Sequence, residues 1–97
     1  MNTEELKKTI AEEDETASTL LFYAMPHASA RFHRLSNSMA KLLNEVREHF
    51  PDARFYTSGG DGFALVLGET HSGKGETPNT ELVASLATKL RVHGGDW

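Results

Sequence analysis

The sequence lacks the residues on which several kinds of site and segment depend. None of its 97 residues is cysteine, which excludes disulfide bonds and thiolate metal sites. Its longest apolar run, residues 20–25, is far too short to span a bilayer, and its start, MNTEELKK, has no apolar signal-peptide segment. The histidines show no metal-binding spacing. We therefore expect a soluble, cytoplasmic protein with no membrane segment, metal or cofactor.

An excess of basic residues is also absent, and the net charge of −4 is unevenly distributed. Six of the fourteen acidic residues but only two of the ten basic residues lie within the first fifteen positions, so the other 82 residues are neutral overall. This distribution argues against a globally basic nucleic-acid-binding protein. It predicts an acidic leader, residues 1–17, which is a flexible arm or a short helix, followed by a single domain, residues 18–97.

The clearest strand pattern is the stretch from Arg54 to Leu67, RFYTSGGDGFALVL. Two strand-like runs flank a glycine-rich turn, where glycine tolerates positive φ angles. The second run, Phe63–Leu67, contains no polar residue, which is typical of a strand covered on both faces. We therefore expect a β-hairpin whose second strand occupies the centre of a sheet.

The clearest helical pattern covers residues 28–50, where apolar residues recur at alternating spacings of three and four. The residues of this apolar stripe are Phe32, Leu35, Met39, Leu42 and Val46. Pro51 ends the helix because the residue before a proline avoids the helical region. A second helix is predicted over residues 78–93, since Thr77 and Pro78 form a good helix start and leucines recur every fourth residue after them.

Residues 18–25, STLLFYAM, allow two interpretations. Pro26 ends the run, and six to eight residues suit a strand and are short for a helix. The alternative is one helix over residues 3–24, which would carry acidic residues through its middle. We favour the strand.

Together these elements predict an α+β domain with the element order β-α-β-β-α. A right-handed crossover sets the first strand parallel to a hairpin strand, which gives a three-stranded sheet of order 2-3-1 with Phe63–Leu67 in the centre and both helices on one face. The sheet then has an apolar open edge at residues 20–25 and an uncovered face. Because natural proteins seldom leave such an edge open, we predict a homodimer.

Two groups of charged side chains are candidates for binding another protein. The first part of the long helix is basic, with no acidic residue before Glu45, and the leader ends in an acidic run. The candidate residues are Arg31, Arg34, Lys41, Glu12, Glu13, Asp14 and Glu15. The basic group also allows weak nucleic-acid binding, although it has few charges and no interleaved aromatic residues.

Residues 68–79 form a long loop rich in Gly, Ser and Thr, which we expect to be mobile or functional. Lys74 lies in this loop between two glycines, but the loop lacks the spacing of a Walker A phosphate-binding loop. Lys74 is a weak candidate for a phosphate contact, as are Gly59 and Gly60 in the hairpin turn.

The string SGGDGFALVL, residues 58–67, resembles the signature hairpin of GGDEF domains, the diguanylate cyclases. In that family a GGDEF or GGEEF turn is followed by a buried strand. The resemblance implies a degenerate nucleotide-binding domain. Gly62 stands where the motif needs a metal-binding acid, and no aspartate is present near residues 25–27, so the resemblance does not extend to cyclase activity.

No linear spacing of catalytic residues rises above chance in this chain. The sequence therefore favours a small, non-enzymatic protein-interaction or regulatory module that acts as a homodimer and binds another protein. The alternatives are the degenerate GGDEF-like nucleotide-binding domain and weak nucleic-acid binding through the basic part of the long helix.

Overall fold

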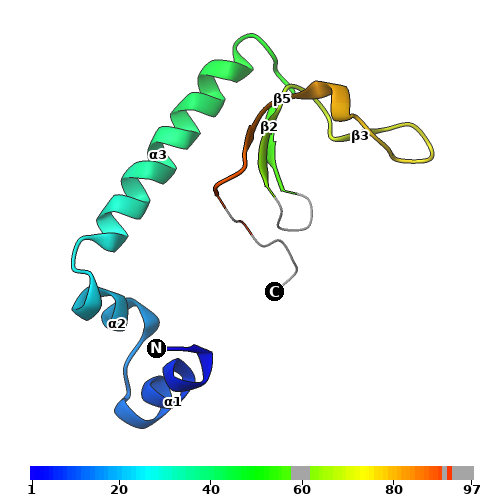
Figure 1. The fold of residues 1–97 in the computed structure, drawn as a ribbon. Coiled ribbons are helices and arrows are strands. Elements are labelled where there is room, and N and C mark those ends of the chain that lie inside the picture. Colours follow the sequence, from blue (N-terminus) through cyan, green and yellow to red (C-terminus); the bar gives the residue numbers. More distant parts are fainter. Residues whose placement is uncertain (58–61, 91, 93–97) are drawn as a thin grey trace. The chain divides into compact units, whose positions relative to one another are not determined.

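The computed structural model of the chain describes residues 1–57, 62–90 and 92, and has both helices and strands (Figure 1). It divides into two compact units, residues 1–38 and 39–97, which we describe separately. The boundary between the units falls within the long helix. The α+β class expected from the sequence is confirmed.

The acidic leader forms a short helix, α1, over Thr3–Glu13. The helix begins at Asn2, whose side chain accepts a hydrogen bond from the Glu5 amide at 2.9 Å and so satisfies one of the free amides of the first turn. It ends at Asp14, which adopts the left-handed conformation with φ 53° and therefore cannot continue the helix. Of the two forms expected for the leader, the structure has the short helix.

The prediction that residues 18–25 form a strand is wrong, because Ala17–Ala24 form a helix, α2. A capping box determines its start: the Thr16 hydroxyl accepts from the Thr19 amide, and the Thr19 hydroxyl accepts from the Thr16 amide, each at 3.1 Å. An apolar run of eight residues fits either element, and this local cap favours the helix. The cap also separates α2 from α1, so the alternative of one continuous helix is wrong as well.

The long helix predicted over residues 28–50 is confirmed as α3, Ala28–Arg47. None of the residues of α1, α2 or α3, all of which the structure describes, is buried. The apolar stripe of α3 is most exposed at Phe32, Leu35 and Leu42, at 69%, 64% and 47% respectively. The apolar side chains of these helices are therefore not explained by burial within the chain.

The predicted hairpin is confirmed, because β1, Arg54–Tyr56, pairs antiparallel with β2, Phe63–Val66. On its other side β2 pairs antiparallel with β5, Val83–Ala87, so the sheet order is β1-β2-β5 (Figure 1). The strand of residues 63–66 thus occupies the centre of the sheet. The predicted order placed residues 18–25 beside this central strand, which is wrong, because β5 occupies that position.

The helix predicted over residues 78–93 is also wrong, because a 3₁₀ turn, η1 over Thr80–Leu82, leads directly into β5. The register of β5 shifts between Leu65 and Val66 of β2, which is the mark of a β-bulge. Because of this bulge, Val83 and Leu86 both lie on the sheet face of their partners in β2, although they are three residues apart. The helix was predicted from the leucines at every fourth residue, but Leu82 lies in η1 and Leu86 lies in β5, so this spacing does not belong to one element.

The long loop of residues 68–79 contains a small hairpin rather than an irregular segment. Its strands are β3, His71–Ser72, and β4, Thr77–Pro78, which pair antiparallel. Gly73 lies in the connecting turn with φ 80°, a conformation that glycine adopts without strain.

The buried hydrophobic side chains among the described residues are Ala53, Ala64 and Val66, and all three belong to the unit of residues 39–97. On the opposite face of the sheet, Phe55 and Phe63 stack with ring centroids 5.2 Å apart. A core of this size is small for a chain of 97 residues. None of the helices in the described part of the chain has both the length and the apolar character needed to cross a membrane.

Candidate functional site

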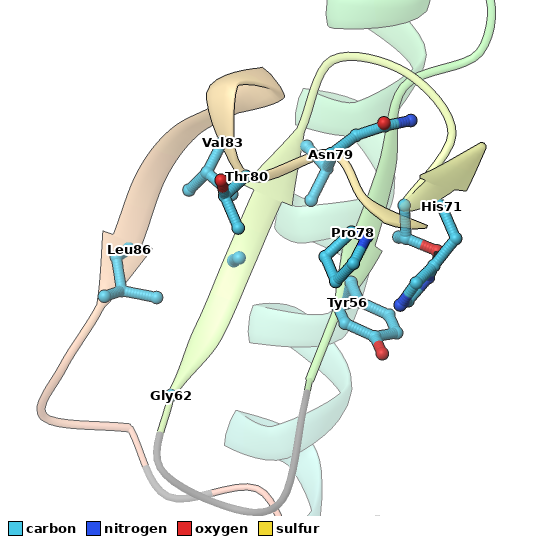
Figure 2. Close-up of a pocket in the computed structure, with 11 residues that line it drawn as sticks. Tyr56, Gly62, His71, Pro78, Asn79, Thr80, Val83 and Leu86 are labelled. Atoms are coloured by element: carbon cyan, nitrogen blue, oxygen red, sulfur yellow. Dashed lines mark hydrogen bonds between the residues drawn. The ribbon is translucent and has the colours of Figure 1, made fainter. Parts of the chain in front are cut away.

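A concave site lies on the face of the sheet to which Ala64 and Val66 point. It is a cavity of about 410 Å³, which we call the trough, and Figure 2 shows the residues that line it. They are Tyr56, Gly62, Ala64, Val66, Thr70, His71, Pro78, Asn79, Thr80, Val83 and Leu86. All of them lie in the unit of residues 39–97.

The shape of the trough follows from the strand register. Val66 and Ala64 of the central strand are paired with Val83 and Leu86 of β5, and Ala64 is also paired with Tyr56 of β1. Paired residues in an antiparallel sheet share a face, so the small central residues form a floor between larger side chains. Figure 2 shows Val83 and Leu86 on one side of this floor and Tyr56 on the other.

Gly62 lies at one end of the floor, where any side chain would reduce the open space. A Cβ atom at this position would lie 3.1 Å from Cδ1 of Leu86, closer than side chains normally approach. The Thr57 hydroxyl lies 2.8 Å from the Gly62 carbonyl and 3.2 Å from the Val92 carbonyl, so it donates its proton between these two acceptors. This contact holds the ends of β1 and β2 together beside the trough.

The rim of the trough near β3 and β4 is positioned by Asn79. Its side-chain Nδ2 donates to the Glu69 carbonyl at 2.9 Å and to Ser72 Oγ at 2.6 Å. Its backbone amide donates to the Thr70 carbonyl at 2.8 Å. These three hydrogen bonds attach Asn79, which follows β4, to the residues before β3 and to Ser72 within it. They hold the two sides of the small hairpin together at the rim of the trough.

The wall of the trough opposite Val83 and Leu86 is aromatic. The rings of Tyr56 and His71 meet edge to face with centroids 6.1 Å apart, and Pro78 lies beside them in Figure 2. His71 Nδ1 is hydrogen-bonded to Thr70 Oγ1 at 3.0 Å, which holds the imidazole in place.

The chemistry of the trough is that of a binding site. Its volume lies within the range of about 300–1,000 Å³ found for ligand pockets, and its floor and both walls are mainly apolar. None of the described residues that line it is Asp, Glu, Lys or Arg. The arrangement suits a neutral, apolar side chain or molecule and gives no charged group to bind phosphate.

The predicted basic residues lie together on α3. Arg31, Arg34 and Lys41 are all exposed and, at spacings of three and seven, share one face of the helix. Arg31 and Arg34 also line a shallow hollow of about 180 Å³ with Leu35 and Ser38. The basic group therefore adjoins the apolar stripe of α3.

The predicted acidic residues lie at and beyond the end of α1. Glu12 and Glu13 are exposed in its last turn, and Asp14 is its C-terminal cap. Glu15 is half-buried and accepts a hydrogen bond from the Thr19 hydroxyl at 2.6 Å, so it supports the start of α2. Negative charge at a helix C-terminus interacts unfavourably with the helix dipole, so these side chains do not stabilise α1.

Of the candidate phosphate contacts, Lys74 lies within the described residues. Lys74 is exposed in the turn between β3 and β4 and is not among the residues that line the trough. Gly59 and Gly60 lie outside the described residues, as does most of the GGDEF-like turn.

Sequence reasoning missed the trough because two of its walls come from segments that were assigned wrongly. Val83 and Leu86 were placed on a helix, and His71 in an irregular loop. One signal for the floor of the trough was available in the sequence. Large and small residues alternate along the central strand, which places Ala64 and Val66 together on one face.

Comparison of the chain with protein-family models, with curated proteins and with solved structures gives no match.

Proposed function

We propose that the chain is a small, non-enzymatic protein-interaction module that acts as a homodimer and binds a partner protein through the trough. The observation that carries the proposal is the trough itself: an open, uncharged, apolar cavity on the face of a sheet with a small core. Open apolar surface of this kind in a small domain marks an interaction site. A single large apolar side chain of the partner, inserted between Leu86 and Tyr56, is the interaction that the lining suits.

The open edges of the sheet are less suited to this role than its face. β1 is three residues long and begins with Arg54, and β5 carries the bulge near Val83. Short strands, charged residues and bulges are the features by which proteins prevent pairing at sheet edges. The partner is therefore expected at the trough.

The test is a comparison of captured proteins on the immobilised full chain, its Leu86→Asp variant and its Leu90→Asp variant. Leu86 lines the trough, whereas Leu90 does not, and the two are similarly exposed, at 56% and 46%. A partner that binds the trough is retained by the parent chain and by Leu90→Asp and is lost with Leu86→Asp, because the new carboxylate must be desolvated. Equal retention by both variants would contradict the proposal.

Homodimer formation is tested separately by light scattering. At micromolar concentration the proposal predicts a mass twice the 10.7 kDa of the chain. A monomer mass would contradict the homodimer. Partner binding through the trough would then be decided by the capture experiment alone.

A second candidate is the degenerate GGDEF-like nucleotide-binding domain. The antiparallel pairing of β1 with β2 on either side of the glycine-rich segment supports it, because the resemblance requires a hairpin there. Titration with GTP or cyclic di-GMP, followed through the amide signals of residues 59–62, tests it. Shifts at micromolar nucleotide would support this function, and unchanged signals at millimolar nucleotide would remove it.

A third candidate, weak nucleic-acid binding, is supported by the common face of Arg31, Arg34 and Lys41. It predicts an affinity that falls steeply with salt, because cationic side chains displace counterions from phosphates. Fluorescence anisotropy with labelled DNA and RNA at low and high salt measures this. Undetectable binding at low salt would exclude it.

A further inference from the structure

From the apolar stripe and the flanking charges of α3 we infer that the homodimer forms through two antiparallel α3 helices, each from one copy. This inference rests on the proposed homodimer and names its interface. The stripe residues Phe32, Leu35, Met39, Leu42 and Val46 alternate at spacings of three and four. This is the heptad pattern in which positions a and d meet a second helix.

The exposure of the stripe shows that it is available for a second copy. Phe32 and Leu35 are 69% and 64% exposed, and Leu42 is 47% exposed, while Met39 and Val46 are half-buried. Three large, exposed apolar residues at positions a and d of one helix form a continuous surface and not isolated side chains.

An antiparallel arrangement uses the whole helix. With Phe32 at position a, the antiparallel register places Phe32 opposite Leu42 of the second copy and Leu35 opposite Met39 of the second copy. The same register places Ala28, the first residue of α3, opposite Val46 near its end. Each layer therefore pairs a larger with a smaller or more flexible side chain, as good packing requires.

The charges beside the stripe decide the orientation. Positions g, which flank the interface, are occupied by Arg31, Ser38 and Glu45. In an antiparallel pair, position g of one helix lies beside position g of the other, so Arg31 meets Glu45 of the second copy, and the two-fold symmetry repeats the pair. In a parallel pair, position g meets position e, which is Ser36 or Leu43, and no opposite charges meet.

The decisive experiment measures the dimer dissociation constant of full-length charge variants by sedimentation equilibrium. Arg31→Glu alone, or Glu45→Arg alone, raises the dissociation constant by about tenfold, since two attractive pairs become repulsive. The double variant Arg31→Glu/Glu45→Arg restores the constant to within about threefold of the parent chain, because the pairs are re-formed with reversed polarity. Lys41→Glu is the control, since it makes the same charge change at position c, away from the interface.

A second measurement tests the register. The chain has no cysteine, so Ser38→Cys introduces its only thiol. This residue lies beside the two-fold axis of the antiparallel pair, so the thiols of two copies oxidise to one symmetric disulfide and lose two electrons and two protons to a supplied oxidant, oxidised glutathione. Lys41→Cys is the control and remains monomeric on denaturing gels under the same oxidant.

The outcomes separate the inference from the proposed function. A dimer in which Arg31→Glu behaves like Lys41→Glu, or in which Ser38→Cys does not cross-link, would overturn the α3 interface and leave the homodimer intact. A parent chain that is a monomer would overturn both. Circular dichroism at 222 nm checks that each variant keeps the helix content of the parent, and each substituted residue is exposed.

Discussion

The two compact units of the chain differ in where their apolar side chains lie. The unit of residues 1–38 contains the most apolar stretch, yet Phe22 and Tyr23 there are 59% and 66% exposed. The unit of residues 39–97 buries Ala64 and Val66, which are smaller. Among the described residues, burial therefore does not follow the length of the apolar run, and two of the three buried side chains lie on the central strand. The helices have exposed apolar surface and no buried residue, whereas the sheet contains a small core.

The largest expected effect is at Val66, in the unit of residues 39–97, which is 2% exposed in the centre of the sheet. Val66→Ala removes buried methyl groups and leaves a cavity, so it lowers the free energy of unfolding by about 2 kcal/mol. Val83→Ala makes the same change at a paired but 41% exposed position and costs under about 1 kcal/mol. Urea denaturation followed by circular dichroism measures both. Equal costs at the two positions would show that Val66 does not belong to a core.

A smaller effect is expected at the turn of the β3–β4 hairpin. Gly73 has φ 80°, so Gly73→Ala strains the backbone and favours local opening of the hairpin by about 1–2 kcal/mol. Gly75→Ala is the matched control, because a Cβ there meets only Thr77 Oγ1 at an ordinary 3.9 Å. Amide exchange at Asn79, which bonds the Thr70 carbonyl, reports the opening. An unchanged exchange rate in Gly73→Ala would contradict the assigned turn.

The smallest effect is expected in the helical unit, at the cap of α2. Thr16→Ala removes the hydroxyl that accepts from the Thr19 amide, which destabilises the helix by about 1 kcal/mol. Ser18→Ala, in the first turn of the same helix, serves as the control. The ellipticity at 222 nm falls with Thr16→Ala and is retained with Ser18→Ala. If neither variant changes the signal, contacts beyond the cap must hold α2.

The elements that were predicted correctly have either a long repeating sequence pattern or an apolar strand next to a recognisable turn sequence. The twenty residues of α3 repeat one apolar stripe, and the β1–β2 hairpin combines an apolar strand with a glycine-rich turn. Both signals are local, so a single sequence was sufficient. The central position of residues 63–66 followed from the absence of polar residues there.

The elements that were predicted wrongly depend on contacts that a linear pattern does not contain. Ala17–Ala24 is short enough for either element, and the hydrogen bonds between Thr16 and Thr19 favour the helix. Leucines at every fourth residue indicated a helix over residues 78–93, whereas residues 83–87 pair with β2, which lies far away in the sequence. The trough was missed for the same reason, since its walls come from β5 and from the β3–β4 hairpin.

The most direct test is amide hydrogen exchange measured at two protein concentrations, one above and one below the dimer dissociation constant. It asks whether the stability of the helices depends on association while the stability of the sheet does not. The predicted result is that protection of α3 rises with concentration while protection of β2 stays constant. Protection of α3 that is independent of concentration, or protection of both elements that rises together, would contradict this difference between the helices and the sheet.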